Sequence, residues 1–382
     1  MASTSEAHLT CLCSTICMPA SLLEAPKLPI QQKICHCDFC RHSTGSLGMS
    51  WPPLKSPPPQ DALSKLTGYK ASEKSTMYFC PTCGFHCFFS TYQKNWFCTS
   101  AMIEQTPSSK ANGMPWPENI IKLSHHIYVL DTIDAAGLSA PNREYNLPHE
   151  DILQLTKVSS KIIEKRDEMS YLPAKCHCGG VSLLIKRGDY TSNSDTEFST
   201  RSLPTDSTKH LTYLCACRSC RLSTGVSLTP WTLIPPSSVF NGNFPTPTPN
   251  TNASSVITQP QTTLQSVAFG HATSNPESNP GLMLKHNWSS PDTCRSFCGV
   301  CGATVTYWCS KRPLEVDLAV GLFRAEEGTL ARSWLEWRWD VKFTFKMFII
   351  KTLNKLLYDF WARKAMYKAS SYFAVSFGCV KT

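Results

Sequence analysis

The stretch Cys35–Trp51, CHCDFCRHSTGSLGMSW, decides how this chain is organised, because the chain contains it twice. The second copy, Cys215–Trp231, reads CACRSCRLSTGVSLTPW. Both fit the pattern C-x-C-x-x-C-R-x-S-T-G-x5-W, and every fixed position is offset by 180 residues. Chance agreement over so many fixed positions is negligible. The sequence therefore indicates a tandem duplication.

Each copy of this motif lies between two further cysteine pairs in the same order. A C-x-C pair precedes it, and a C-x-x-C-G knuckle follows it. We therefore expect a first domain at 7–135, a linker at 136–169, a second domain at 170–340 and a tail at 341–382. Within the second domain, the Ser-, Thr-, Asn- and Pro-rich segments 188–210 and 235–281 are expected to be exposed and partly disordered.

The net charge of the chain resides mainly in the tail. The 382 residues include 37 basic and 28 acidic side chains, a balance of +9. Eight of the basic residues and a single acid, Asp359, fall within 341–382, so the rest of the chain is close to neutral. A body this neutral argues against nucleic-acid binding. The tail is compatible with a basic amphipathic segment for a membrane surface. It is equally compatible with a poorly ordered extension or a misplaced gene boundary.

Neither a signal peptide nor a transmembrane segment is expected. The N-terminal sequence MASTSEAHLTCLC lacks a basic region and an apolar core. No stretch of about 18 apolar residues occurs. We therefore expect a cytoplasmic protein whose 20 cysteines stay reduced. Clustered cysteines are then better interpreted as metal ligands than as disulfides.

Short β-branched or aromatic runs bounded by Gly and Pro predict a mainly β protein. Strands are expected at 85–89, 181–185 and 303–308. Short helices are expected at 325–339 and, in the linker, at 151–169.

Seven motif cysteines in each copy divide into four and three. The C-x-C pair and the knuckle supply four thiolates, enough to close a tetrahedral structural zinc site. Such a site joins the two ends of a small domain, and its binding energy is folding energy. The predicted structural ligands are Cys11, Cys13, Cys80 and Cys83 in copy one, and Cys176, Cys178, Cys298 and Cys301 in copy two.

The middle motif predicts a second kind of site. C-x-C-x-x-C can surround one ion with three ligands and leave a fourth position for water or a substrate thiol, as in catalytic zinc. Zinc there could hold a thiolate or polarise an aldehyde oxygen. The alternatives are a closed structural site with a fourth protein ligand, or plain reduced cysteine. The predicted metal-binding and catalytic residues are Cys35, Cys37 and Cys40 in copy one, and Cys215, Cys217 and Cys220 in copy two.

The neighbours of the middle motif leave several roles open. Arg41 and Arg221 either bind an anionic substrate or offset thiolate charge. His36 has Ala216 as its counterpart, which excludes a shared role, and we expect its side chain to face solvent. The following Ser-Thr-Gly is expected to form a turn or cap. The other cysteines are expected to be mostly buried small hydrophobes; they are Cys17, Cys87, Cys98, Cys294, Cys309 and Cys379.

On these motifs the chain resembles the glutathione-dependent formaldehyde-activating enzyme family, which also includes centromere protein V. The order C-x-C, C-x-C-x-x-C-R-x-S-T-G and C-x-x-C-G carries the resemblance, twice. It implies tandem all-β, zinc-stabilised domains of the β-tent (Mss4-like) kind, with two zinc ions each, and tandem copies resemble fungal members. It implies carbon–sulfur lyase activity, in which glutathione adds to formaldehyde. The family's four-cysteine zinc is structural, and its three-cysteine zinc is the reaction centre.

The resemblance also leaves an alternative function and one local difference. A non-catalytic zinc scaffold for protein partners is the alternative to a lyase that takes a small thiol and an aldehyde. Copy one has Ser14 after its first cysteine pair, where copy two has Gly179, so its opening strand is less strongly predicted.

Overall fold

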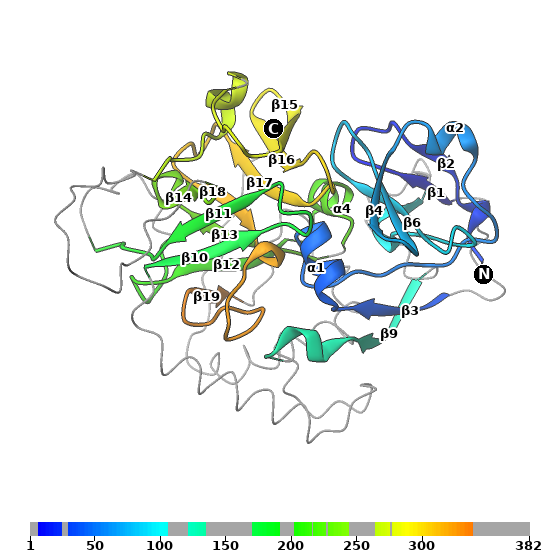
Figure 1. The fold of residues 1–382 in the computed structure, drawn as a ribbon, viewed down its shortest axis with the longest axis horizontal. Helices are drawn as coiled ribbons and strands as arrows, with labels where there is room; N and C mark the ends of the chain where they lie inside the picture. The colour runs from blue at the N-terminus through cyan, green and yellow to red at the C-terminus, as the bar shows by residue number, and fades with distance from the viewer. Residues whose placement is uncertain are drawn as a thin grey trace, which may run out of the picture.

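The computed structural model describes residues 7–24, 30–105, 121–134, 170–191, 202–215, 217–226, 228–243, 264–275 and 277–338. Most of the regular structure is β, arranged in several sheets with a few short helices (Figure 1). The prediction of a mainly β protein is confirmed. The helix predicted for the linker lies outside the described residues, and so does the tail 341–382.

Copy one, residues 7–134, contributes three small sheets. A four-stranded antiparallel sheet follows the order β4-β5-β6-β7, a three-stranded sheet has β1 at its centre, and β3 and β9 form a parallel pair. Its strands are β1 (Ala7–Thr10), β2 (Cys17–Pro19), β3 (Ile30–Cys35), β4 (Thr67–Ser72), β5 (Ser75–Phe79), β6 (His86–Thr91), β7 (Asn95–Cys98), β8 (Ile103–Gln105) and β9 (Ile121–Ile127). Its helices are η2 (Ala20–Leu22), α1 (Asp38–Thr44), α2 (Gln60–Leu63), η3 (Ser100–Met102) and η4 (Val129–Thr132).

Copy two, residues 170–338, contributes a seven-stranded sheet and a three-stranded sheet, in the orders β15-β16-β17-β18-β13-β12-β19 and β10-β11-β14. Its strands are β10 (Tyr171–Lys175), β11 (Ser182–Lys186), β12 (His210–Cys215), β13 (Thr229–Ile234), β14 (Val239–Asn241), β15 (Leu284–Ser290), β16 (Thr293–Cys298), β17 (Thr304–Cys309), β18 (Val316–Ala319) and β19 (Leu335–Arg338). Its helices are α4 (Arg218–Thr224), η8 (Pro236–Ser238), η9 (Gly270–Ser274) and η10 (Val320–Leu322).

The three predicted strands are confirmed as β6, β11 and β17. The strand β17, TVTYWC, is rich in β-branched and aromatic side chains, which pack well on a pleated surface. The helix predicted at 325–339 is wrong. Gly328 has a φ of +120°, and the following segment runs as the strand β19, which pairs in parallel with β12. Backbone pairing with a neighbouring strand therefore overrides the local pattern.

The two copies exchange contacts through the helices that carry the middle motifs. Helix α1 of copy one lies against η10 of copy two, and α4 of copy two lies against η3 of copy one (Figure 1). The amide of Leu12 donates to the carbonyl of Leu222 at 3.1 Å, and the amide of His177 donates to that of His42 at 2.9 Å. These two bonds join equivalent positions, because each runs from the centre of a C-x-C pair to the other copy's helix. Reciprocal contacts of this kind are the pattern of an isologous, two-fold-like interface.

The knuckle glycines show the same reciprocity. Gly84 and Gly302 have φ values of +77° and +78°, a left-handed conformation that favours glycine. A Cβ on Gly84 would come within 3.0 Å of the ring of Phe297, and a Cβ on Gly302 would do the same at Phe79. Each knuckle therefore packs directly on an aromatic ring of the other copy.

Candidate metal centres

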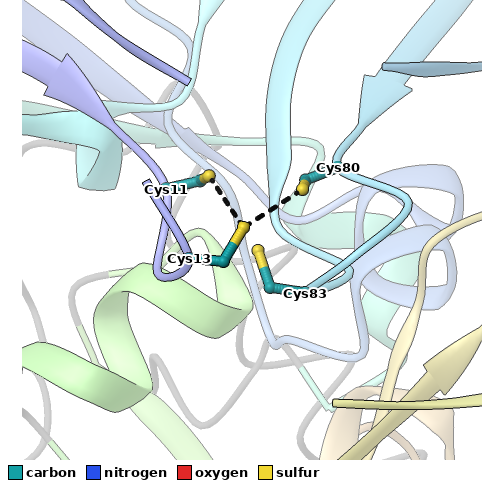
Figure 2. Close-up of side chains that lie close together, drawn as sticks. All are labelled: Cys11, Cys13, Cys80 and Cys83. Carbon is teal, nitrogen blue, oxygen red and sulfur yellow. Dashed lines mark hydrogen bonds between the residues drawn. The ribbon is translucent and has the colours of Figure 1, made fainter. Parts of the chain in front are cut away.

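The four-cysteine cluster of copy one unites two segments far apart in sequence. Cys11 and Cys13 follow β1, whereas Cys80 and Cys83 form the turn between β5 and β6. Figure 2 shows the four sulfur atoms pointing toward one another. The Sγ of Cys13 lies 3.6 Å from that of Cys11 and 3.5 Å from that of Cys80, and all four Sγ atoms lie within 4.8 Å of one another.

The corresponding cluster of copy two has the same geometry. The Sγ of Cys178 lies 3.5 Å from those of Cys176 and Cys298, and Cys301 completes the group. In both clusters the knuckle is closed by the same backbone bond, from the glycine amide to the first cysteine carbonyl at 2.9 Å. The structure therefore brings together both predicted sets of four.

The C-x-C turn explains how copy one tolerates the missing glycine. Ser14 adopts a φ of +59°, close to the +78° of Gly179, and each donates its amide at 3.1 Å to the first cysteine of its pair. The opening hairpin forms in spite of the strain, since β1 pairs with both β2 and β8. The serine therefore carries a backbone cost of roughly 1–2 kcal/mol.

The spacing of these sulfurs fits a tetrahedral metal site. Four thiolates at about 2.3 Å from a zinc ion are about 3.8 Å apart, close to the separations of 3.5 and 3.6 Å in both clusters. Every cysteine that the structure describes is a free thiol. Both sets of four therefore suit a bound metal rather than disulfides.

The three-cysteine clusters are built by a strand followed by a short helix. In copy one, Cys35 ends β3, Cys37 caps α1 and Cys40 lies in its first turn. The Sγ of Cys37 lies 3.3 Å from that of Cys35 and accepts the amide of Cys40 at 3.4 Å. Gly45 ends the helix in the left-handed conformation at φ +77°, as the Ser-Thr-Gly prediction requires.

Copy two repeats this arrangement. Cys217 caps α4, lies 3.4 Å from Cys215 and accepts the amide of Cys220 at 3.4 Å. The residues at the open edge, Cys215 and Cys217, are half-buried, whereas Cys220 is buried. Among the described residues, no further His, Cys, Asp or Glu joins either set of three. The alternative of a fourth protein ligand therefore finds no support in that part of the chain.

Hydrogen bonds from neighbouring thiols lower the pKa of at least one cysteine in each cluster, against the opposing effect of burial. The pKa of Cys37 is lowered to about 3, chiefly because Cys35 and Cys40 can donate hydrogen bonds to its thiolate. The pKa of Cys217 falls well below its usual range for the same reason. In the four-cysteine clusters, the pKa values of Cys13 and Cys178 are lowered by their cysteine neighbours. The thiolate, and not the thiol, is the form of cysteine that binds metal.

The surroundings of the two sets of three differ. The set in copy one packs against Met49, Phe39 and Trp51, with Val226 of copy two completing the cluster. The phenyl ring of Phe39 also meets the His177 ring at 5.0 Å, edge to face.

The set in copy two faces a buried guanidinium instead. Arg295 places Nη1 at 3.9 Å from the Sγ of Cys220 and 3.1 Å from the hydroxyl of Ser223, and it lies over the ring of Tyr307. The strand register places Met77 at the equivalent position of copy one. The first set is therefore lined by apolar side chains, and the second carries an extra positive charge.

Burial decides between the alternatives left open for Arg41, Arg221 and His36. Arg41 is buried and binds Asp38 and the carbonyl of His36, so its guanidinium is committed to local structure. Arg221 is buried against Glu104. Neither arginine is positioned as a free anion receptor. The expectation of a solvent-facing His36 is wrong, because its ring is buried and hydrogen-bonded to His126 and to the carbonyl of Leu47.

The cysteines outside the clusters follow the prediction in part. Cys87, Cys98 and Cys294 are buried, whereas Cys309 is half-buried and Cys17 is exposed. Cys379 lies outside the described residues.

Comparison with known proteins identifies the first copy. Residues 6–112 match the family model described as glutathione-dependent formaldehyde-activating enzyme. This segment is similar to that family. The match covers both cysteine clusters of copy one and just over a quarter of the chain. No curated protein and no solved structure matches the chain.

The family match and the four cysteine clusters together indicate a metal-binding protein of the formaldehyde-activating type. Among the helices that the structure describes, none has the length and apolar character to cross a bilayer.

Proposed function

We propose that the chain is a zinc-dependent carbon–sulfur lyase that joins a thiol to an aldehyde and reverses that reaction. The observation that carries the proposal is the contrast between the clusters. Four sulfurs complete one kind of site, whereas the other kind offers three, with a half-buried edge. Three protein ligands and an open position are typical of catalytic zinc. The family name suggests glutathione as the thiol and formaldehyde as the aldehyde.

The reaction is an addition in which no atom is lost. The thiol sulfur bonds to the carbonyl carbon, and the thiol proton goes to the carbonyl oxygen; the reverse step breaks the C–S bond and returns the proton. When bound, zinc would supply Lewis acidity and a position for the thiolate. The chain itself holds the three ligands in place. Cys37 and Cys217 are kept as thiolates and oriented by the amides of Cys40 and Cys220.

We place this activity in two zinc domains, 7–135 and 170–340, each with one structural zinc and one reaction centre. The proposed setting is the cytoplasm, where the thiols stay reduced. Neither nucleic acid nor a membrane is needed for the reaction.

The direct test is adduct formation from formaldehyde and glutathione with the zinc-loaded full chain. The rate should exceed the rate without protein, and the double variant Cys37→Ser/Cys217→Ser should return it to that level. The variant Cys17→Ser is the matched control, because Cys17 is exposed and outside every cluster. If the wild type gives no acceleration with glutathione or with a panel of other thiols, the enzyme proposal fails.

A non-catalytic zinc scaffold is the second candidate, and one observation favours it. The C-x-C turns that hold the four-cysteine clusters also make the backbone bonds between copies, at Leu12 and His177. Metal content separates the two candidates. Four zinc ions per chain support loaded reaction centres, whereas two support structural sites alone.

A further inference from the structure

Opposite charges occupy equivalent positions on the two halves of the interface between copies. The motif offset makes Asp38 of α1 equivalent to Arg218 of α4. The strand pairings make Glu104 equivalent to Arg324. The pair β6 and β7 in copy one corresponds to the pair β17 and β18 in copy two, and in each copy a short helix, η3 or η10, follows the second strand. The first position of α4 is therefore a base that lies near an acid of copy one, whereas the first position of α1 is an acid that shares a cavity with a base of copy two.

The half formed by α4 and β8 is a closed ion-pair network. The carboxylate of Glu104 accepts from Nε of Arg218 at 2.8 Å, and from Nη2 of Arg221 at 2.6 Å. Arg221 and Glu104 are both buried, and His8 approaches the same carboxylate at 3.9 Å. The pKa of Glu104 is lowered because these guanidinium groups outweigh the opposing effect of burial.

The half formed by α1 and the segment after η10 has the reverse polarity. Arg324 and Asp38 line a cavity of about 210 Å³ together with Arg41, Asp131 and neighbouring residues. Asp38 binds Arg41 and lies 3.5 Å from His42, and Arg324 donates to the carbonyl of Lys175 at 2.9 Å. Arg324 and Asp38 therefore share this cavity as opposite charges, without the direct hydrogen bonds that hold Glu104 to its arginines.

The invariant arginines make this reversal informative. Arg41 and Arg221 occupy the same position in both copies, whereas the charge is reversed at two pairs of equivalent positions, Asp38/Arg218 and Glu104/Arg324. Pairing copy two with a second copy two would place Arg324 against Arg218 and Arg221, three guanidinium groups without the carboxylate of Glu104. Pairing copy one with another copy one would place Glu104 against Asp38. Like charges brought together at an interface are unfavourable, and repulsive pairs are a recognised means of rejecting wrong partners.

We propose that Asp38, Glu104, Arg218 and Arg324 form a charge code that pairs copy one with copy two and rejects pairing of like copies. The partner that this surface fits is therefore the other half of the same duplicated chain.

Charge exchange in the full, zinc-loaded chain tests the code without changing its net charge. In the two-position exchange Glu104→Arg/Arg324→Glu, like charges face each other in both halves of the interface within one chain. Opposite charges would face each other where copy one of one chain pairs with copy one of another, or copy two with copy two. We expect its thermal midpoint to fall by at least about 6 °C, since breaking a buried pair costs about 3 kcal/mol or more. We also expect at least a twofold rise in particle mass by light scattering, as like copies pair between chains.

The four-position exchange adds Asp38→Arg and Arg218→Asp, which transfers the charge arrangement of each half to the other. It should restore the wild-type midpoint to within about 2 °C, a shift of roughly 1 kcal/mol, and the wild-type mass. The code is refuted if the two-position variant matches the wild type in both midpoint and mass. It is also refuted if the four-position variant is as impaired as the two-position variant.

Discussion

Replacing a knuckle glycine should show that the copies fold against each other. In Gly84→Ala, the left-handed φ of +77° costs about 1–2 kcal/mol for any residue with a Cβ. The added Cβ also comes within 3.0 Å of the ring of Phe297, in the core between copies. Overpacking of this kind costs about 1–3 kcal/mol. The expected loss of stability is therefore about 2–5 kcal/mol.

Gly179 serves as a matched control that separates the overpacking cost from the backbone strain. Gly179 has nearly the same φ, +78°, but a Cβ there would meet only the flexible side chain of Lys175, at 3.3 Å. Gly179→Ala should therefore cost only the backbone strain, which Ser14 already carries in copy one. Thermal midpoints at fixed zinc concentration and scan rate provide the assay. At about 2–4 °C per kcal/mol, Gly84→Ala should unfold roughly 2–12 °C below Gly179→Ala.

A double-mutant cycle completes this test. In a Phe297→Ala background the ring is gone and only the Cβ of residue 297, at 2.8 Å, is left to meet the added Cβ, so Gly84→Ala should cost less than it does in the wild type. Equal midpoints for Gly84→Ala and Gly179→Ala in the wild-type background would refute the packing between copies described above.

Two further predictions concern metal and pH. Cys298→Ser removes one of four structural ligands, so it should unfold copy two and lower zinc content, because structural zinc contributes on the order of 10 kcal/mol to folding; Cys217→Ser should abolish adduct formation at that site with a much smaller shift in midpoint. Equal destabilisation by the two changes would contradict this division of roles. Burial lowers the pKa of His210 to about 4 from 6.5. Because the unfolded chain then binds more protons, the stability that neutral His210 contributes should fall by up to about 3 kcal/mol between pH 6.5 and 4. His36 and His86, whose pKa burial also lowers to about 4, add to the total change. Denaturant titrations across this range should show that the free energy of unfolding depends less on pH in His210→Gln than in the wild type. An unchanged pH dependence would mean that His210 does not take up the proton responsible.

The sequence predicted those features that local spacing encodes. Within each C-x-C pair, each C-x-x-C-G knuckle and each set of three, the cysteines lie together because the turns between them are short. The two pairs of each set of four are 67 or more residues apart, and they meet as the repeated order of the motifs predicted. Strands such as β17 were predictable because their side chains alternate and are β-branched. Burial at positions such as His36 depends on residues 90 positions away and leaves no local pattern.

The contacts between copies could not be predicted from local sequence patterns either, because they join residues far apart in the chain. Arg221 was weighed as a substrate receptor or a thiolate counterion, yet it is bound to Glu104, 117 residues earlier in the chain. One signal was available in the sequence: the aligned motifs carry Asp38 and Arg218 at one position. A charge reversal between duplicates at an otherwise matching motif is a reason to look for an interface between them.

The duplicates have kept their metal-binding geometry while changing what surrounds it. The three cysteines and the capping amide are the same in both sets of three. Yet Arg295 stands beside Cys220, where copy one has Met77. A bound substrate thiolate adds one negative charge to a cluster of three thiolates. Under the proposed function, Arg295 would offset that charge in copy two, whereas the apolar wall of copy one would favour an uncharged partner such as a small aldehyde. If both centres are active, the second should hold anionic thiols more tightly, and Arg295→Met should remove that preference.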